Sequence, residues 1–177
     1  MDDNGEPRGA PTIVVMGVTG VGKTTVGERL AAALHLPFLD ADEFHSDEAK
    51  AKMHAGIGLT DSDRAPWLDG LHRALQEHAG TGLVLACSAL KESYREQLAA
   101  GLDHVRFLWL TGDPAVLRGR IDARHGHYAG SDLLPSQLAT LEPPRDAVTV
   151  DVDGTLEQTV QLALTGLRLD RRDRGTR

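Results

Sequence analysis

The feature that most constrains this chain is the segment GVTGVGKT at residues 17–24. It matches the phosphate-loop pattern G-x-x-x-x-G-K-[ST] at every fixed position. The apolar run TIVVM at residues 12–16 precedes it, and apolar residues at the spacing i, i+4, i+8 follow it, so we expect a strand before the loop and a helix over 24–34. This strand–loop–helix context is the one that the motif requires, whereas a glycine-rich turn that merely matches the pattern is the alternative.

The residue types in this loop have chemical reasons. Glycines let the backbone wrap closely around an anion, and the helix that starts near Gly22 adds the positive end of its dipole. We expect Lys23 to reach the β- and γ-phosphates and the Thr24 hydroxyl to ligate Mg²⁺. The motif thus predicts a nucleoside triphosphate and Mg²⁺, but it does not identify the acceptor. The expected nucleotide-binding residues here are Gly17, Val18, Thr19, Gly20, Val21, Gly22, Lys23, Thr24 and Thr25.

Along the rest of the chain, short apolar runs alternate with helical patterns. Strands are expected at 12–16, 37–42, 83–87, 105–110 and 147–152. Helices are expected at 24–34, 45–55, from a first turn that holds Pro66, at 91–100, from Asp113-Pro114, and at 156–167, with a loop at 125–132. Strands that alternate with helices predict a five-stranded parallel sheet covered on both faces, a three-layer α/β fold over residues 11–168. Residues 1–10 are expected to form a disordered leader and residues 169–177 a disordered basic tail, for which contact with a polyanion is the alternative.

Composition limits the class of protein. The 177 residues suffice for one domain, and a net charge of −7 argues against a nucleic-acid-binding or anionic-membrane protein. Cys87 is the one cysteine, so no internal disulfide can form and a reducing, cytoplasmic location is expected. No apolar stretch approaches the length of a membrane-spanning helix.

Two carboxylates, Asp40 and Asp42, end the second expected strand. Residues i and i+2 of a strand point to the same face, and open α/β sheets bind ligands at the carboxyl ends of their strands. One carboxylate could hold Mg²⁺ and the other could accept a proton from an acceptor alcohol. No acid follows the third strand at 83–87, so we expect metal support from Asp40. The alternative is a solvated loop that carries two acids.

Arginines indicate where anionic groups could bind. Arg64 could fork onto a substrate carboxylate, although a surface ion pair with Asp61 or Asp63 is the alternative. Arg120 and Arg124 lie four residues apart on one helical face beside a glycine-containing loop. Such cationic side chains suit a lid that closes on phosphates, whereas a solvated helix face is the alternative.

At this point the chain resembles the bacterial-type gluconokinase family, small phosphate-loop sugar-acid kinases related to shikimate kinase. Besides the phosphate loop, the resemblance rests on DSDRAPWL at 61–68, CSALK at 87–91, RHGHY at 124–128 and SQLATLEPP at 136–144, which run in family order within residues 12–165. It implies a nucleoside-monophosphate-kinase-like fold, a short lid at about 124–134, and often a homodimer. It also implies ATP-dependent phosphorylation of gluconate, a small-molecule substrate.

The resemblance further implies roles for individual residues. Catalysis would fall to Lys23, Asp42 and Arg124, and Arg120 would stack on adenine. Asp42, His45, Arg64, Lys91 and His127 would bind the acceptor, with Thr24 and Asp40 near the metal. The chain departs from the family pattern at Ala41, Ser46 and Ala49. A kinase for another small hydroxy or sugar acid, shikimate-like, is therefore one alternative, and a nucleotide-binding module without turnover is another.

Overall fold

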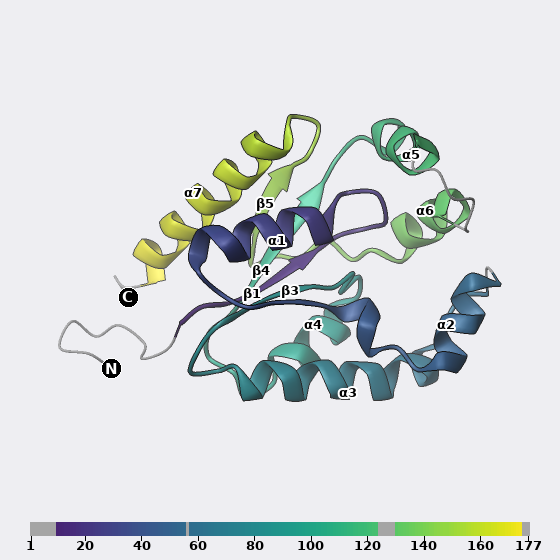
Figure 1. The fold of residues 1–177 in the computed structure, drawn as a ribbon, viewed down its shortest axis with the longest axis horizontal. Coiled ribbons are helices and arrows are strands. Elements are labelled where there is room, and N and C mark those ends of the chain that lie inside the picture. The colour runs from purple at the N-terminus through teal and green to yellow at the C-terminus, as the bar shows by residue number, and fades with distance from the viewer. Residues whose placement is uncertain (1–9, 56, 124–129, 175–177) are drawn as a thin grey trace.

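The computed structural model describes residues 10–55, 57–123 and 130–174. Five parallel strands form one sheet in the order β2-β3-β1-β4-β5, between layers of helices (Figure 1). The expected three-layer α/β fold with a five-stranded parallel sheet is confirmed. The strands are β1 (Thr12–Met16), β2 (Phe38–Asp40), β3 (Leu83–Ala86), β4 (Val105–Thr111) and β5 (Ala147–Asp151).

Helices cover both faces of this sheet. In the described part of the chain they are α1 (Lys23–Leu34), the 3₁₀ helix η1 (Ala41–Phe44), α2 (Asp47–His54), α3 (Asp61–Glu77), α4 (Glu92–Ala99), α5 (Pro114–Ala123), α6 (Gly130–Thr140) and α7 (Leu156–Arg174). Figure 1 shows α1 and α7 on one face of the sheet and α3 and α4 on the other. No helix in the described ranges is long and apolar enough to cross a bilayer.

The central strand β1 divides the hydrophobic core in two. Ile13 and Val15 pack with residues of α1 and α7, whereas Val14 and Met16 pack with residues of α3 and α4. Alternate strand residues point to opposite faces, and because both faces are covered the strand is apolar throughout. All five residues of β1 are buried, so the loop that follows starts from a fixed point.

Two elements in the first half of the chain, β2 and α3, differ from the expected bounds. Strand β2 ends at Asp40 rather than at residue 42, and η1 follows it directly. Helix α3 begins at Asp61, five residues before Pro66, because Thr60 and Asp63 form a capping box in which each side chain binds the other's backbone N–H. Pro66 therefore lies inside the helix and not in its first turn.

Two further differences lie in the second half of the chain. Residues 130–140 form the helix α6, where a loop over 125–132 was expected and no helix was predicted beyond it. Helix α7 extends to Arg174 rather than ending at 167, so most of the segment expected to be a disordered tail is helical. Residues 1–9 and 175–177 of the expected termini lie outside the described residues.

Candidate active site

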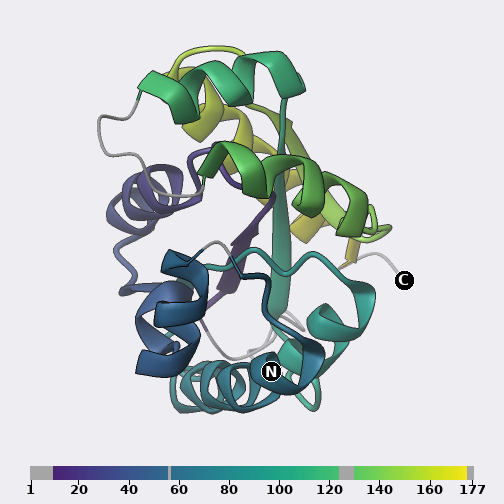
Figure 2. The ribbon, with the colours of Figure 1, turned by 90° about the vertical axis from the view of Figure 1, so that its right-hand side faces the viewer.

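A cavity of about 850 Å³ opens at the carboxyl ends of the strands. Figure 2 looks onto this end of the molecule, with α2 and α3 on one side and α5 and α6 on the other. The cavity walls come from the phosphate loop, the end of β2, the start of α3, the β3–α4 connection and α6. Of the expected site residues, it is lined by Thr19, Gly20, Gly22, Lys23, Thr24, Thr25, Asp40, Asp42, His45, Arg64 and Lys91.

The phosphate loop owes its shape to glycine and to two buried valines. Gly17 has a φ of 143°, and a Cβ at this position would meet the Leu110 carbonyl oxygen at 2.5 Å. Val18 and Val21 are only 4% and 1% exposed because they pack into the core. These two side chains anchor the loop, and therefore Val18 and Val21 can serve a ligand only through their backbone.

The loop ends at the N-terminus of α1. Gly22 caps the helix in a left-handed conformation and supplies no side-chain cap, so the first N–H groups of α1 are not satisfied by a capping side chain. Such groups, together with the helix dipole, favour an anion. The Lys23 ammonium donates a hydrogen bond to the Val18 carbonyl oxygen at 3.0 Å, so the lysine folds back along the loop.

Asp40 connects the phosphate loop with η1. Its carboxylate accepts hydrogen bonds from the Thr24 hydroxyl at 2.7 Å and from the Asp42 backbone N–H at 3.0 Å. The expectation that the two acids share one face of a strand is wrong for Asp42, because the chain turns into η1 after Asp40. Both acids nevertheless line the cavity, Asp40 from the end of β2 and Asp42 from η1.

His45 lines the cavity and is only 8% exposed. Its ring stacks on Trp67 with centroids 4.5 Å apart, and Trp67 Nε1 donates to the Ala41 carbonyl oxygen at 2.7 Å. Within the described residues, His45 Nδ1 is buried without a hydrogen-bond partner. Burial lowers the pKa of His45 from its usual value, although nearby Asp42 opposes this shift.

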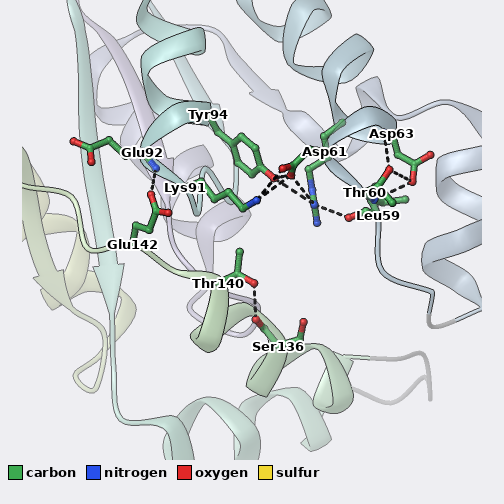
Figure 3. Close-up of polar contacts among 11 residues, drawn as sticks. Leu59, Thr60, Asp61, Asp63, Lys91, Glu92, Tyr94, Ser136, Thr140 and Glu142 are labelled. Carbon is green, nitrogen blue, oxygen red and sulfur yellow. Dashed lines mark hydrogen bonds and ion pairs between the residues drawn. The ribbon is translucent and has the colours of Figure 1, made fainter.

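Asp61, Arg64, Lys91 and Tyr94 form a cluster of polar contacts, which we call the Asp61 cluster, and its first three members line the cavity. Figure 3 shows Asp61, Lys91 and Tyr94 of this cluster. Lys91 Nζ lies 3.0 Å from both Asp61 carboxylate oxygens, and the Tyr94 hydroxyl donates to the same carboxylate. The Tyr94 hydroxyl, and after it Lys91, lower the pKa of Asp61 because they stabilise its ionised form. Asp61 and Tyr94 were not among the expected site residues, since no motif chemistry singles them out.

Arg64 is only partly engaged in this cluster. One terminal nitrogen donates to the Leu59 carbonyl oxygen at 2.6 Å and to the Tyr94 hydroxyl at 3.4 Å. The ion pair with Asp61 expected under the alternative has a separation of 4.0 Å, and Asp63 instead pairs with Lys52 at 2.7 Å. The guanidinium therefore keeps donors that can reach a ligand.

One face of α6 completes the cavity. Leu133, Ser136, Gln137 and Thr140 line it, at the spacing i, i+3, i+4, i+7 of a helical face. Gln137 Oε1 accepts a hydrogen bond from the Thr19 backbone N–H of the phosphate loop at 2.6 Å. Sequence reasoning missed this helix, although the apolar spacing of Leu134, Leu138 and Leu141 was a signal for it.

Several other expected residues are placed elsewhere or are not described. Arg120 donates to the Val152 carbonyl oxygen and does not line the described cavity, so its contact with adenine stays a prediction. Arg124 and His127 lie outside the described residues, as does most of the expected lid at 124–134. Burial raises the pKa of the Cys87 thiol to about 12, which agrees with an inert cysteine.

Comparisons with known proteins agree with this geometry. The shikimate kinase family profile matches residues 19–161. A gluconokinase from Gluconobacter oxydans is 48% identical over 136 residues, which are 76% of this chain and 76% of the relative. The crystal structure of a gluconokinase from Sinorhizobium meliloti is 43% identical with a TM-score of 0.83, covering 94% of this chain and 97% of the other.

The crystal structure of a shikimate kinase from Bacteroides thetaiotaomicron resembles this chain in fold but not in sequence. It has a TM-score of 0.63 over 89% of this chain and 98% of its own, but it is only 16% identical. The likeness to that enzyme extends to the fold alone. The chain is far more similar in sequence to the two gluconokinases, and it is also more similar in structure to the one from Sinorhizobium meliloti.

Proposed function

Because the chain belongs to the gluconokinases, within the shikimate kinase family of phosphate-loop kinases, we propose that it phosphorylates D-gluconate with ATP. The products are 6-phospho-D-gluconate and ADP. A bond forms between the acceptor hydroxyl oxygen and the γ-phosphorus, and the bond from that phosphorus to the β,γ-bridging oxygen breaks. The hydroxyl proton goes to a base in the site.

The observation that carries this proposal is the shared cavity. It holds the phosphate loop on one wall and the cationic side chains of Arg64 and Lys91 on another, with Asp42 also in its lining. A kinase for a small acid needs a phosphate site, a carboxylate site and a base so close together that one bound acceptor can reach all three. A volume of about 850 Å³ lies within the range of ligand sites in proteins.

The phosphate loop would bind the triphosphate through its backbone. The N–H groups near Gly22 would meet the phosphate oxygens, and the Lys23 ammonium, which lies at the Val18 carbonyl oxygen, would reach the β- and γ-phosphates. As the γ-phosphoryl group transfers, charge develops on its oxygens and on the leaving ADP. Preorganised donors at these positions lower the barrier because they do not have to reorient during the reaction.

Asp42 would take the proton of the attacking hydroxyl. It is exposed to the cavity, and its side chain makes no hydrogen bond to a described residue, so both oxygens can accept. The hydrogen bond from its backbone to Asp40 fixes where η1 begins and therefore where this carboxylate stands. Positioning of this kind is the main contribution a protein makes to phosphoryl transfer.

Thr24 and Asp40 suit Mg²⁺. The Thr24 hydroxyl donates its proton to Asp40, which leaves the hydroxyl lone pairs for a cation, and both groups line the cavity beside the loop. Mg²⁺ commonly keeps several waters and takes one or two protein ligands together with phosphate oxygens. When bound there, it would neutralise charge on the β- and γ-phosphates.

The Asp61 cluster would bind the gluconate carboxylate. Arg64 presents a planar fork, and Lys91 adds a second positive charge that Asp61 holds in place. A carboxylate that binds here would replace its hydrogen bonds to water with charge-assisted hydrogen bonds from Arg64 and Lys91. A neutral polyol gains no such bonds, so the cluster favours an acid.

The departures from the family pattern lie behind the cavity wall. Ser46 caps α2 by accepting the Ala49 N–H at 3.1 Å, and Ala49 itself is buried. Ala41 is 1% exposed and contributes its carbonyl oxygen to Trp67, which any residue could do. None of these three residues lines the described part of the cavity, so the proposed contacts to gluconate do not depend on them.

A panel of acceptors tests this proposal. ADP release is followed by a coupled assay with ATP and Mg²⁺, in the presence of gluconate, of shikimate, or of no acceptor. We expect rapid release with gluconate and little above background in the other two. Release with shikimate alone would identify a different acid kinase, and no acceptor-dependent release would indicate a nucleotide-binding module without turnover.

The proposal extends to the setting of the enzyme. We place it in the cytoplasm, where ATP is available and a lone buried Cys87 stays reduced. The homodimer implied by the resemblance also stays a prediction. Size-exclusion chromatography with light scattering checks it, because a dimer doubles the monomer mass of 19.0 kDa.

A further inference from the structure

The hydrogen bond between Thr19 and Gln137 joins two cavity walls that are 118 residues apart in the sequence. Its donor is a backbone N–H of the phosphate loop, and its acceptor is the side-chain carbonyl Oε1 of a residue on α6, at 2.6 Å. The proposed function gives Gln137 no role, and the SQLATLEPP segment that contains it entered only as part of a resemblance. The contact nevertheless lies in the cavity.

The chemistry of the bond fixes the orientation of the amide. A backbone N–H can only donate, so the Gln137 atom that faces it must be the oxygen. The amide NH₂ then points away from Thr19. Within the described residues this NH₂ makes no hydrogen bond, although it belongs to a half-buried side chain that lines the cavity. Two N–H donors are thus held beside the loop.

The place of the bond indicates which part of the ligand these donors face. Lys23 donates to the Val18 carbonyl, so its ammonium lies at the residue next to Thr19. In this motif the lysine reaches the β- and γ-phosphates, whereas the backbone N–H groups of the loop hold the α- and β-phosphates. The Val18–Thr19 end of the loop is therefore the end near the terminal phosphate.

We propose that Gln137 is a further catalytic residue, which anchors on Thr19 through Oε1 and donates its NH₂ to an oxygen of the transferred γ-phosphoryl group. This role rests on the proposed function, since it requires a nucleoside triphosphate at the loop. It gives α6 a part in the reaction, because the helix brings a donor to the end of the loop that lies near the terminal phosphate.

Gln137→Met tests the role, because methionine keeps the length of the side chain and removes both polar atoms. The dissociation constants of ADP and of a non-hydrolysable ATP analogue are measured with Mg²⁺ on the full chain. ADP lacks the γ-phosphate, so its affinity should stay within about twofold of wild type. Loss of a hydrogen bond to a charged oxygen should weaken the analogue by about tenfold or more. Gln76→Met, an exposed glutamine on α3, is the matched control and should change neither.

The outcomes separate the alternatives. An equal loss for both nucleotides would mean that Gln137 only shapes the loop, and no loss for either would mean that the bond is incidental; both overturn the inference. If Gln137→Met fails to fold, Gln137→Glu keeps the acceptor for Thr19 and exchanges the donor for an oxygen, and the same selective loss is expected. If wild type itself does not bind ADP, the proposed function fails, and not merely this residue's role.

Discussion

Replacing Arg64 with alanine should weaken gluconate and leave ATP almost unaffected. One terminal nitrogen of Arg64 is used by the Leu59 carbonyl and the Tyr94 hydroxyl. Its Nε and other terminal nitrogen make no hydrogen bond within the described residues, and 27% of the side chain is exposed. These two donors form the fork that a carboxylate would meet in the cavity.

The magnitude follows from the bonds that are lost. A hydrogen bond to a charged group contributes about 1.5–3 kcal/mol, and about 1.4 kcal/mol corresponds to a factor of ten. We therefore expect Arg64→Ala to raise the KM for gluconate by roughly 10- to 150-fold. Arg64→Lys should recover only part of this loss, because an ammonium has no planar fork.

The assay is the KM for each substrate, with the other at saturation, in wild type and in the two variants. Arg73→Ala is the matched control, because Arg73 lies on the same helix, is exposed, and among the described residues makes only a long contact to the Asp69 carbonyl at 3.4 Å. An unchanged gluconate KM in Arg64→Ala would refute the reasoning and leave Arg64 as a packing residue on Tyr94. Equal increases for gluconate and ATP would indicate a distorted cavity instead.

Three further predictions concern Lys23, Asp42 and His45, which also line the cavity. Lys23→Ala should lower turnover by about 10²–10³ in a folded protein, and near-normal turnover would remove Lys23 from catalysis. Asp42→Asn should lower kcat by about 10²–10⁴ and leave ATP affinity unchanged. The loss should lie at the low end if the bond to the leaving ADP breaks before the bond to the acceptor forms. A loss confined to ATP affinity would contradict this role. The folded pKa of His45 is lowered below 6.5, so the unfolded state binds more protons, and the free energy of unfolding should fall as the pH drops through that value. His45→Gln should reduce that slope in denaturant titrations, and an unchanged slope would assign it to other groups.

The parts of the fold that sequence predicted well are those in which local pattern and tertiary packing agree. The phosphate loop has fixed spacing, and the strands around it are continuous apolar runs because helices cover both faces of the sheet. The resemblance to gluconokinases, not periodicity, supplied the acceptor, and the comparisons agree with it.

The parts that sequence did not predict depend on contacts between distant residues. The turn into η1 after Asp40 is held by a side-chain cap that alternation along a strand cannot show. Helix α6 contains glycine, proline and polar residues that masked its apolar spacing, and the contact between Gln137 and Thr19 that places it at the cavity joins residues too far apart for local pattern to show. The sequence suggested Asp61 only as a surface ion-pair partner of Arg64, whereas its carboxylate pairs with Lys91, 30 residues away.

The most direct test of the central claim is the identity of the product made from gluconate and ATP. A ³¹P–¹H correlation spectrum of the purified product shows which carbon carries the phosphate. The account predicts one phosphomonoester signal coupled to the two protons of the terminal CH₂ group of gluconate, formed in a one-to-one ratio with ADP. A phosphate coupled to a single CH proton, or inorganic phosphate as the sole phosphorus product, would contradict it.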